Sequence, residues 1–183
     1  MEMTAENICF SGGAAGADLA WGAAAAQRGD AVIHFSFTGH RTAAPRDTRR
    51  VLSAAELRAA DPHLARAAAA LSRPWPPENH YARALLRRDW YQVKDSARLY
   101  AVASFRRDGQ IAGGTAWTVA MFMGRADLDN AFLFDQEAER WLVWRDEWVP
   151  IAQPPVPSGR WTGIGTRALN AAGAAAIAAL LAP

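Results

Sequence analysis

The chain has 183 residues, of which 51% are hydrophobic and 21% are charged, and it contains eight tryptophans. This composition excludes an intrinsically disordered chain and predicts one globular domain over residues 1–183, because two ordinary domains would need more residues. The formal net charge is only +2, with Lys94 as the single lysine, so charge alone does not indicate a partner such as nucleic acid.

Cysteine content and hydropathy exclude several further classes. Cys9 is the only cysteine and lies in an apolar run, which predicts a buried structural thiol. No apolar run is long enough for a membrane span, and residues 1–7 lack the basic and then apolar pattern of a secretory signal. We therefore expect a cytoplasmic protein with no membrane partner. The four histidines show no short ligand spacing, so we expect no metal and no other cofactor.

The first part of the chain has the pattern of a strand, a glycine-rich turn, a helix and a second strand. The apolar run 7–10 leads into the turn, and the alanine-rich stretch 14–28 predicts a helix. The segment 31–37 is rich in β-branched and aromatic residues and predicts the second strand. Such a βαβ unit favours a parallel sheet.

The other predicted elements follow in chain order. Residues 38–47 predict a basic loop, and helices are predicted over 51–71, with a break at Asp61-Pro62, and over 81–93. Strands are predicted over 99–105, 131–134 and 141–144, with 148–151 continuing the last of these. A helix is predicted over 116–123, and a final alanine-rich helix follows the glycine-rich segment 163–167 and runs to Leu181. The pattern predicts an α/β fold with a Rossmann-like doubly wound, mainly parallel sheet of about five or six strands and helices on both faces.

Three glycine-rich segments precede predicted helices, and a helix amino terminus with glycines beside it can bind an anion. In parallel sheets such loops converge at the carboxyl edge, which predicts a shared pocket for phosphate. Neither the dinucleotide fingerprint nor a Walker A loop is present. The alternative is that the glycines serve only tight turns and close packing. The predicted ligand-binding residues are Ser11, Gly12, Gly13, Gly16, His40, Arg41, Gly113, Gly114, Thr115, Gly165, Thr166 and Arg167.

Several polar residues allow a functional and a structural interpretation. Asp18 stands in the first turn of a predicted helix, where the helix dipole favours a carboxylate, but it is also a candidate for a ribose contact or for catalysis. His40 and Arg41 follow a strand and either contact a phosphate or form a solvated basic loop. Arg83, Arg87 and Tyr91 share one helical face, which favours surface ion pairs over a nucleotide contact.

Two motifs carry a family resemblance. The stretch Ser11 to Asp18, SGGAAGAD, precedes a helix and a short strand, and the turn Gly113-Gly114-Thr115 follows the strand LYAVASF. Together they resemble the SLOG superfamily of Rossmann-like nucleotide-binding proteins over roughly residues 7–134. At the first loop the nearest branches are the YspA/YpsA-like and molybdenum-carrier-like proteins, and lysine-decarboxylase-like phosphoribohydrolases are further relatives. The resemblance implies a Rossmann-like fold with a nucleotide-derived ligand.

The chain departs from the phosphoribohydrolases where those enzymes carry their catalytic glutamate. Their pattern is Pro-Gly-Gly-x-Gly-Thr-x-x-Glu, and aligning its first two glycines on Gly113 and Gly114 puts Ala120 at the glutamate position. N-glycosidic cleavage would therefore need a carboxylate from elsewhere in the chain. The candidates are Asp18, Asp89 and Asp135.

Three functions remain open at this point. The first is binding of a nucleoside monophosphate or an ADP-ribose-type ligand by a sensor or carrier, and the second is a nucleotide N-glycosidase, phosphoribohydrolase or ribosyltransferase that uses Asp18. The third is a nucleic-acid-associated protein, which the scarce lysines disfavour. Tryptophans 141, 144, 148 and 161 either form a stacking platform or pack in a core or an interface, and the latter leaves a homodimer open.

Overall fold

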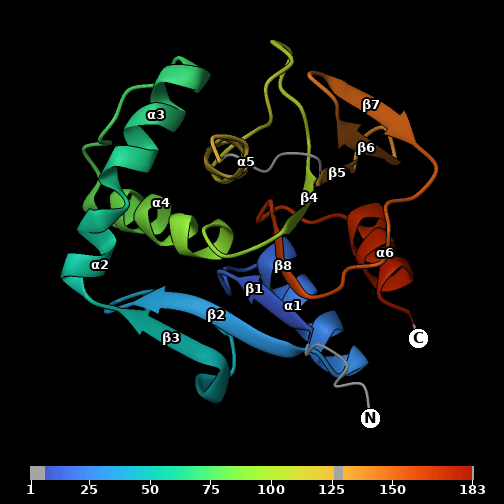
Figure 1. Ribbon diagram of the computed structural model, residues 1–183, viewed down its shortest axis with the longest axis horizontal. Coiled ribbons are helices and arrows are strands. Elements are labelled where there is room, and N and C mark those ends of the chain that lie inside the picture. Colours follow the sequence, from blue (N-terminus) through green and yellow to red (C-terminus); the bar gives the residue numbers. More distant parts are fainter. Residues whose placement is uncertain (1–6, 126–129, 183) are drawn as a thin grey trace.

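The computed structural model describes residues 7–125 and 130–182 (Figure 1). The strands are β1 (Ile8–Ser11), β2 (Ala31–Phe37), β3 (Arg49–Leu52), β4 (Arg98–Ala103), β5 (Ala131–Asp135), β6 (Arg140–Trp144), β7 (Trp148–Ile151) and β8 (Arg160–Gly165). The helices are α1 (Ala17–Arg28), α2 (Ala54–Ala59), α3 (Asp61–Leu71), α4 (His80–Val93), α5 (Thr115–Met123) and α6 (Ala171–Leu180), with one short 3₁₀ turn at Arg46–Thr48.

The described strands form one sheet in the order β3-β2-β1-β8-β4-β5-β6-β7. Neighbouring strands from β3 to β5 are parallel, whereas β5, β6 and β7 pair antiparallel. The protein is therefore an α/β protein with a mostly parallel sheet. β8, the last strand in the chain, lies between β1 and β4 at the centre of the sheet.

Helices cover both faces of the sheet (Figure 1). α1 packs on β1, β2 and β8, and α6 lies beside it near β5. On the opposite face, α4 packs on β2, β1 and β8, while α5 packs on β4, β5 and β8. α2 and α3 form an outer group on α4 and α5, so α4 and α5 are held between this group and the sheet.

Several predicted elements are confirmed. The βαβ start is present, with β2 over the predicted residues 31–37. α1 ends at Gly29, which adopts the left-handed conformation that glycine favours at a helix terminus. The break predicted at Asp61-Pro62 separates α2 from α3, and Pro62 lies in the first turn of α3, where its missing N–H costs nothing.

Two strands were missed, so the prediction of about five or six strands is wrong. The described residues form eight. β3 occupies residues 49–52, where the sequence predicted the start of a helix at Val51. Residues 163–167 were predicted as a glycine-rich loop before a helix, but Gly163 and Gly165 belong to β8. Residues 148–151 form a separate antiparallel strand.

Tryptophans pack in the core beside β8. Trp21 and Trp161 are fully buried and meet edge to face with ring centroids 5.8 Å apart. A Cβ atom on Gly163 would lie only 2.4 Å from Trp21, so this strand needs glycine to admit the indole. Trp141 is also buried. No helix within the described part of the chain has the length and apolar character that crossing a membrane requires.

Candidate functional site

A cavity of about 510 Å³ opens at the carboxyl end of β8, between α4 and α5. Four segments far apart in the sequence supply its walls, so the cavity exists only in the folded chain. Its lining residues are Ala14, Asp18, Ala82, Leu85, Leu86, Arg88, Asp89, Gln92, Ala112, Gly113, Gly114, Thr115, Trp117, Thr118, Ile164, Gly165, Thr166, Arg167 and Ala168.

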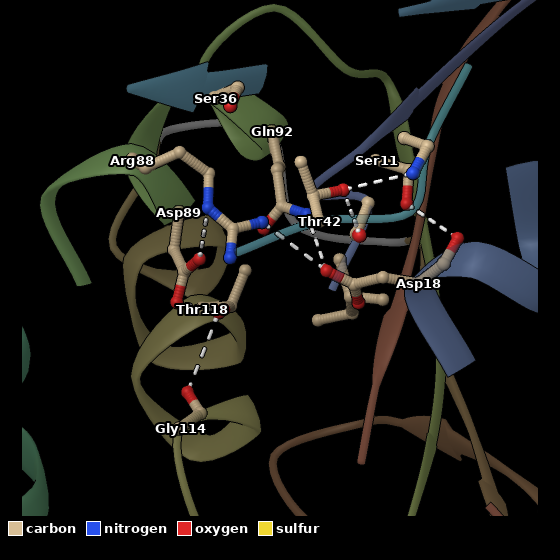
Figure 2. Close-up of polar contacts among 12 residues, drawn as sticks. Ser11, Asp18, Ser36, Thr42, Arg88, Asp89, Gln92, Gly114 and Thr118 are labelled. Carbon is tan, nitrogen blue, oxygen red and sulfur yellow. Dashed lines mark hydrogen bonds and ion pairs between the residues drawn. The ribbon is translucent and has the colours of Figure 1, made fainter. Parts of the chain in front are cut away.

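Buried charged side chains line one wall of this cavity. Figure 2 shows Arg88 of α4 between the carboxylates of Asp89 and Asp18. Nη1 of Arg88 lies 3.3 Å from Oδ2 of Asp18, and its Nε lies 3.3 Å from Oδ1 of Asp89. Arg88 is only 3% exposed. Because a buried cation is costly without compensation, the two carboxylates account for its position.

Both oxygens of the Asp18 carboxylate are engaged by the chain. Oδ1 accepts a hydrogen bond from the backbone N–H of Gly165 at 3.1 Å, while Oδ2 accepts from Arg88 and from Nε2 of Gln92, each at 3.3 Å. Burial raises the pKa of Asp18, although these donors and the positive charge of Arg88 oppose the shift. Asp18 therefore joins α1, α4 and β8 at the cavity wall.

Asp89 has fewer partners than Asp18. Oδ2 accepts a hydrogen bond from Thr118 Oγ1 of α5 at 3.2 Å, and Oδ1 faces Nε of Arg88. Burial raises the pKa of Asp89 to about 7, an effect that the charge of Arg88 partly offsets. Asp89 is thus a carboxyl group able to hold or release a proton near neutral pH beside the cavity.

The first glycine loop, residues 11–16, packs against segments next to the cavity. Ser11, Gly12, Gly13 and Gly16 do not line it. A Cβ atom on Gly13 would lie 2.8 Å from Cβ of Ala44, and one on Gly16 would lie 2.4 Å from the carbonyl oxygen of Thr166. Gly13 and Gly16 thus allow chain segments to pack closely, which is the structural role considered for this loop as the alternative to ligand binding.

The second glycine loop, in contrast, borders open space. Gly113 and Gly114 are exposed, and a Cβ atom at either position would meet no atom within 4 Å. No side chain caps the amino terminus of α5, so the first N–H groups of this helix are available to an anion. This segment, which includes Thr115, forms the polar mouth of the cavity.

Arg73 holds this second loop in place from outside the cavity. Its Nη1 donates to the carbonyl oxygen of Gly113 at 3.0 Å, and its Nη2 donates to the carbonyl oxygen of Ile111 at 3.1 Å. Nη2 also donates to Oε1 of Gln110 at 3.0 Å. Because Arg73 engages carbonyl groups of the loop, it fixes the backbone just before α5 begins.

The segment after β8 supplies the third side of the mouth. Gly165, the last residue of β8, lines the cavity together with Thr166 and Arg167, but the N–H of Gly165 is already donated to Asp18. Within the described part of the chain, the exposed Arg167 side chain has neither an ion pair nor a hydrogen bond. It is a cation at the mouth of the cavity with free donors.

His40 and Arg41 lie outside this lining. Nδ1 of His40 lies 3.1 Å from Oγ of Ser36, and its ring stacks on Phe37. Burial, followed by the charges of Arg88 and Arg167, lowers the pKa of His40 to about 4. The imidazole is therefore neutral at neutral pH. The Arg41 guanidinium packs over the ring of Tyr81.

Arg88 and Gln92 were not among the site residues predicted from the sequence. Leu85, Arg88, Asp89 and Gln92 are spaced as one stripe along a helix, so they share the face of α4 that meets the cavity. That spacing was the available signal, but two of these side chains are charged and looked like a solvent-facing surface. Arg87 lies on another face of α4 and has a structural role, since its Nε pairs with Oδ1 of Asp61 in α3 at 2.7 Å.

Asp135, the third candidate carboxylate, does not line the cavity. Its Oδ1 accepts a hydrogen bond from the backbone N–H of Glu137 at 3.1 Å, as part of the turn after β5. Among the described residues, no group of three or more histidine, cysteine or acidic side chains is arranged to hold a metal ion.

Comparison of the chain with models of protein families, with curated proteins and with solved structures gives no match. The fold and the site therefore define the class in structural terms. It is an α/β protein with a mostly parallel sheet and a cavity at the carboxyl end of its central strand β8, walled by buried charges.

Proposed function

We propose that this cavity binds a phosphorylated nucleotide or a nucleotide-derived ligand, of the nucleoside monophosphate or ADP-ribose type, and that the protein acts as a sensor or carrier. The observation that carries the proposal is the open space at Gly113 and Gly114, beside the uncapped amino terminus of α5 and the unpaired Arg167. Backbone N–H groups at a helix start and an arginine fork are two standard ways to bind a phosphate group.

The rest of the cavity suits a nucleoside. Ala82, Leu85, Leu86 and Trp117 provide apolar and aromatic surface on which a base can rest. The buried wall of Asp18, Arg88 and Gln92 provides donors and acceptors that a ribose can use. A volume of about 510 Å³ lies in the range of small-molecule sites.

The topology supports the same proposal. We propose that the parallel part of the sheet is a Rossmann-like doubly wound fold, because the chain moves outward from β1 to β3 and then, on the other side of β8, from β4 to β5. Ligands of such sheets bind at the carboxyl edge where the strand order reverses. The resemblance of SGGAAGAD and of the Gly-Gly-Thr turn to the SLOG superfamily points the same way.

The test is isothermal titration calorimetry of the protein with adenosine, adenosine monophosphate, ADP-ribose and NAD, followed by chromatography of each sample. We expect phosphorylated ligands to bind and adenosine to bind at least tenfold more weakly, since charge-assisted contacts to phosphate are lost. Intact ligand after incubation fits a sensor or carrier. Equal affinity for adenosine and its monophosphate would contradict a phosphate site at Arg167.

A second candidate function is cleavage of the N-glycosidic bond of a nucleotide. The observation that favours it is Asp89, a buried carboxyl group on the same cavity whose pKa is raised to about 7. Protonated Asp89 can donate its proton to the leaving base nitrogen while water forms a bond to the sugar carbon as the carbon–nitrogen bond breaks. The attacking water releases one proton, which returns through solvent to the Asp89 carboxylate. Asp18 is less suited to this role, because both of its carboxylate oxygens already accept hydrogen bonds from the chain.

Release of free base, measured by chromatography, distinguishes the two functions. If the cavity is catalytic, Asp89→Asn should reduce base release at least a hundredfold while calorimetry still detects ligand binding, because an amide cannot supply the proton. No base release by the wild-type protein from any bound nucleotide would reject the enzyme and leave the sensor or carrier.

A further inference from the structure

A second cavity lies on the other side of α5. Its volume is about 460 Å³, and α3, the loop 109–111, α5 and the β6–β7 hairpin form its walls. Thr115 and Thr118 of α5 line the first cavity, whereas Val119 and Met123 line the second. The two cavities are therefore separate, and the second one plays no part in the proposed nucleotide site.

The lining of the second cavity is mostly apolar. Its main side chains are Ala67, Leu71, Val119, Met123, Trp144 and Trp148. Within the described part of the chain, the large hydrophobic side chains that are exposed are Val51 and Val156, which lie elsewhere. An open apolar cavity is therefore an exception on this surface, and such exceptions usually mark binding sites.

One cation, the exposed side chain of Arg66, borders the cavity, and a neighbouring histidine orients it. The His63 ring stacks on Trp90 with centroids 3.5 Å apart, and its Nδ1 lies 2.9 Å from Nη2 of Arg66. Burial and the neighbouring charge of Arg66 lower the pKa of His63, so the neutral ring can accept this hydrogen bond. The stack on α4 thus orients the guanidinium group of α3.

No described carboxylate neutralises Arg66. Asp61, on the same helix, pairs with Arg87, and Asp108, beside the loop 109–111, pairs with Arg106. Arg66 makes no ion pair with any residue of the described chain, and the other polar side chains of the lining are His63 and Gln110. The cavity therefore presents one positive charge on an apolar surface.

We propose that this cavity binds a small amphipathic carboxylate, with its apolar body between α3, α5 and the β6–β7 hairpin and its carboxylate on Arg66. The geometry selects this class for two reasons. Apolar walls favour removal of a hydrocarbon body from water, and a planar arginine fork pairs with a carboxylate through two parallel hydrogen bonds. A second phosphorylated nucleotide does not fit this lining, because its sugar and phosphate would lack partners on most of the wall.

Tryptophan fluorescence reports occupancy, because Trp144 and Trp148 lie in the cavity wall. We would titrate the full chain with octanoate, 1-octanol and octylammonium, and with benzoate to compare an aromatic body. Octanoate or benzoate should change the fluorescence saturably, 1-octanol should bind about tenfold more weakly, and octylammonium should bind weakest. No saturable change with either carboxylate, or binding of octylammonium as tight as that of octanoate, would overturn the proposal.

Two variants locate the ligand. Arg66→Gln should weaken octanoate binding about tenfold and leave 1-octanol unchanged, whereas Arg58→Gln, on the exposed surface of α2, should change neither. Ala70 is exposed at the wall, so Ala70→Trp can fill the cavity without entering the core and should abolish binding of both ligands. Unchanged octanoate affinity in a folded Arg66→Gln or Ala70→Trp protein would reject this site.

Discussion

The guanidinium group of Arg88 occupies the space that a side chain at position 12 would need. A Cβ atom on Gly12 would lie 1.1 Å from Nη1 of Arg88 and 2.4 Å from Oδ2 of Asp18. The first glycine loop thus makes room for a buried ion pair between α1 and α4. Gly12 serves the cavity indirectly, through the charged wall that it admits.

Gly12→Ala should therefore destabilise the fold. The added methyl group must displace Arg88 or Asp18, which leaves a buried charge with poorer compensation, and we expect a loss of roughly 2–4 kcal/mol in the free energy of unfolding. Urea denaturation measures this loss. Gly114→Ala is the matched control, because its Cβ would meet no atom within 4 Å, and it should change stability by less than about 0.5 kcal/mol. Equal stability of both variants would contradict the packing described for Arg88.

Asp89 should make the stability of the protein depend on pH. Its pKa is raised from 3.8 to about 7 in the folded state, so between these values the folded chain holds a proton that the unfolded chain has released. Stability contributed by Asp89 is complete below about pH 4 and is lost as the pH rises toward about 7, by roughly 2–4 kcal/mol.

Asp89→Asn removes this titration while keeping the acceptor for Thr118. We expect the stability of the variant relative to the wild type to increase as the pH rises from about 4 to about 7, as measured by urea denaturation at several pH values. Asp135→Asn serves as a control, since Asp135 lies outside the cavity. Parallel pH profiles for wild type and Asp89→Asn would show that Asp89 titrates normally.

Arg73→Gln should weaken ligand binding although Arg73 does not line the cavity. Without its bonds to the carbonyl groups of Ile111 and Gly113, the loop before α5 can leave the orientation that presents N–H groups to a phosphate. We expect about a tenfold loss of affinity and a stability loss of about 1–2 kcal/mol. Calorimetry of a phosphorylated nucleotide with Arg73→Gln, and with the exposed Arg107→Gln as control, checks this. An unchanged affinity would mean that Arg73 is only structural.

Gly163→Ala should be strongly destabilising for a reason that also explains a missed strand. Its Cβ would lie 2.4 Å from the buried Trp21, so the indole or the strand must shift. We expect a loss of roughly 2–4 kcal/mol in the free energy of unfolding, measured by urea denaturation. Gly124→Ala, whose nearest contact would be an ordinary 3.4 Å, should cost less than about 1 kcal/mol. A small effect of Gly163→Ala would show that the core around Trp21 can relax.

The elements that were predicted correctly are those whose signal is local. β2 has β-branched and aromatic residues along its length, and α1 has a glycine stop. β8 was missed because its glycines, which look like a loop in sequence, are required by Trp21 on a distant helix. β3 was missed because four residues with two arginines carry no clear period. Long-range packing decided both cases.

The same distinction applies to the candidate site. The second glycine turn, Thr166 and Arg167 line the cavity, and their glycine-rich loops could be recognised in the sequence. The buried role of Arg88 was missed because a charged helical residue is normally solvated. Its burial depends on Asp89 beside it and on Asp18, which lies seventy residues earlier in the chain. Pairs that are this distant leave no periodic pattern in the sequence.

The most direct measurement of the central claim is calorimetry with the Gly114→Leu variant. Gly114 has a helical backbone conformation and open space around it, so leucine there should leave the fold intact while occupying the proposed phosphate position. We predict at least a hundredfold loss of affinity for a phosphorylated nucleotide that the wild type binds, with no loss in the control Ala178→Leu on the exposed surface of α6. Wild-type affinity in a folded Gly114→Leu protein would contradict a ligand site at the start of α5.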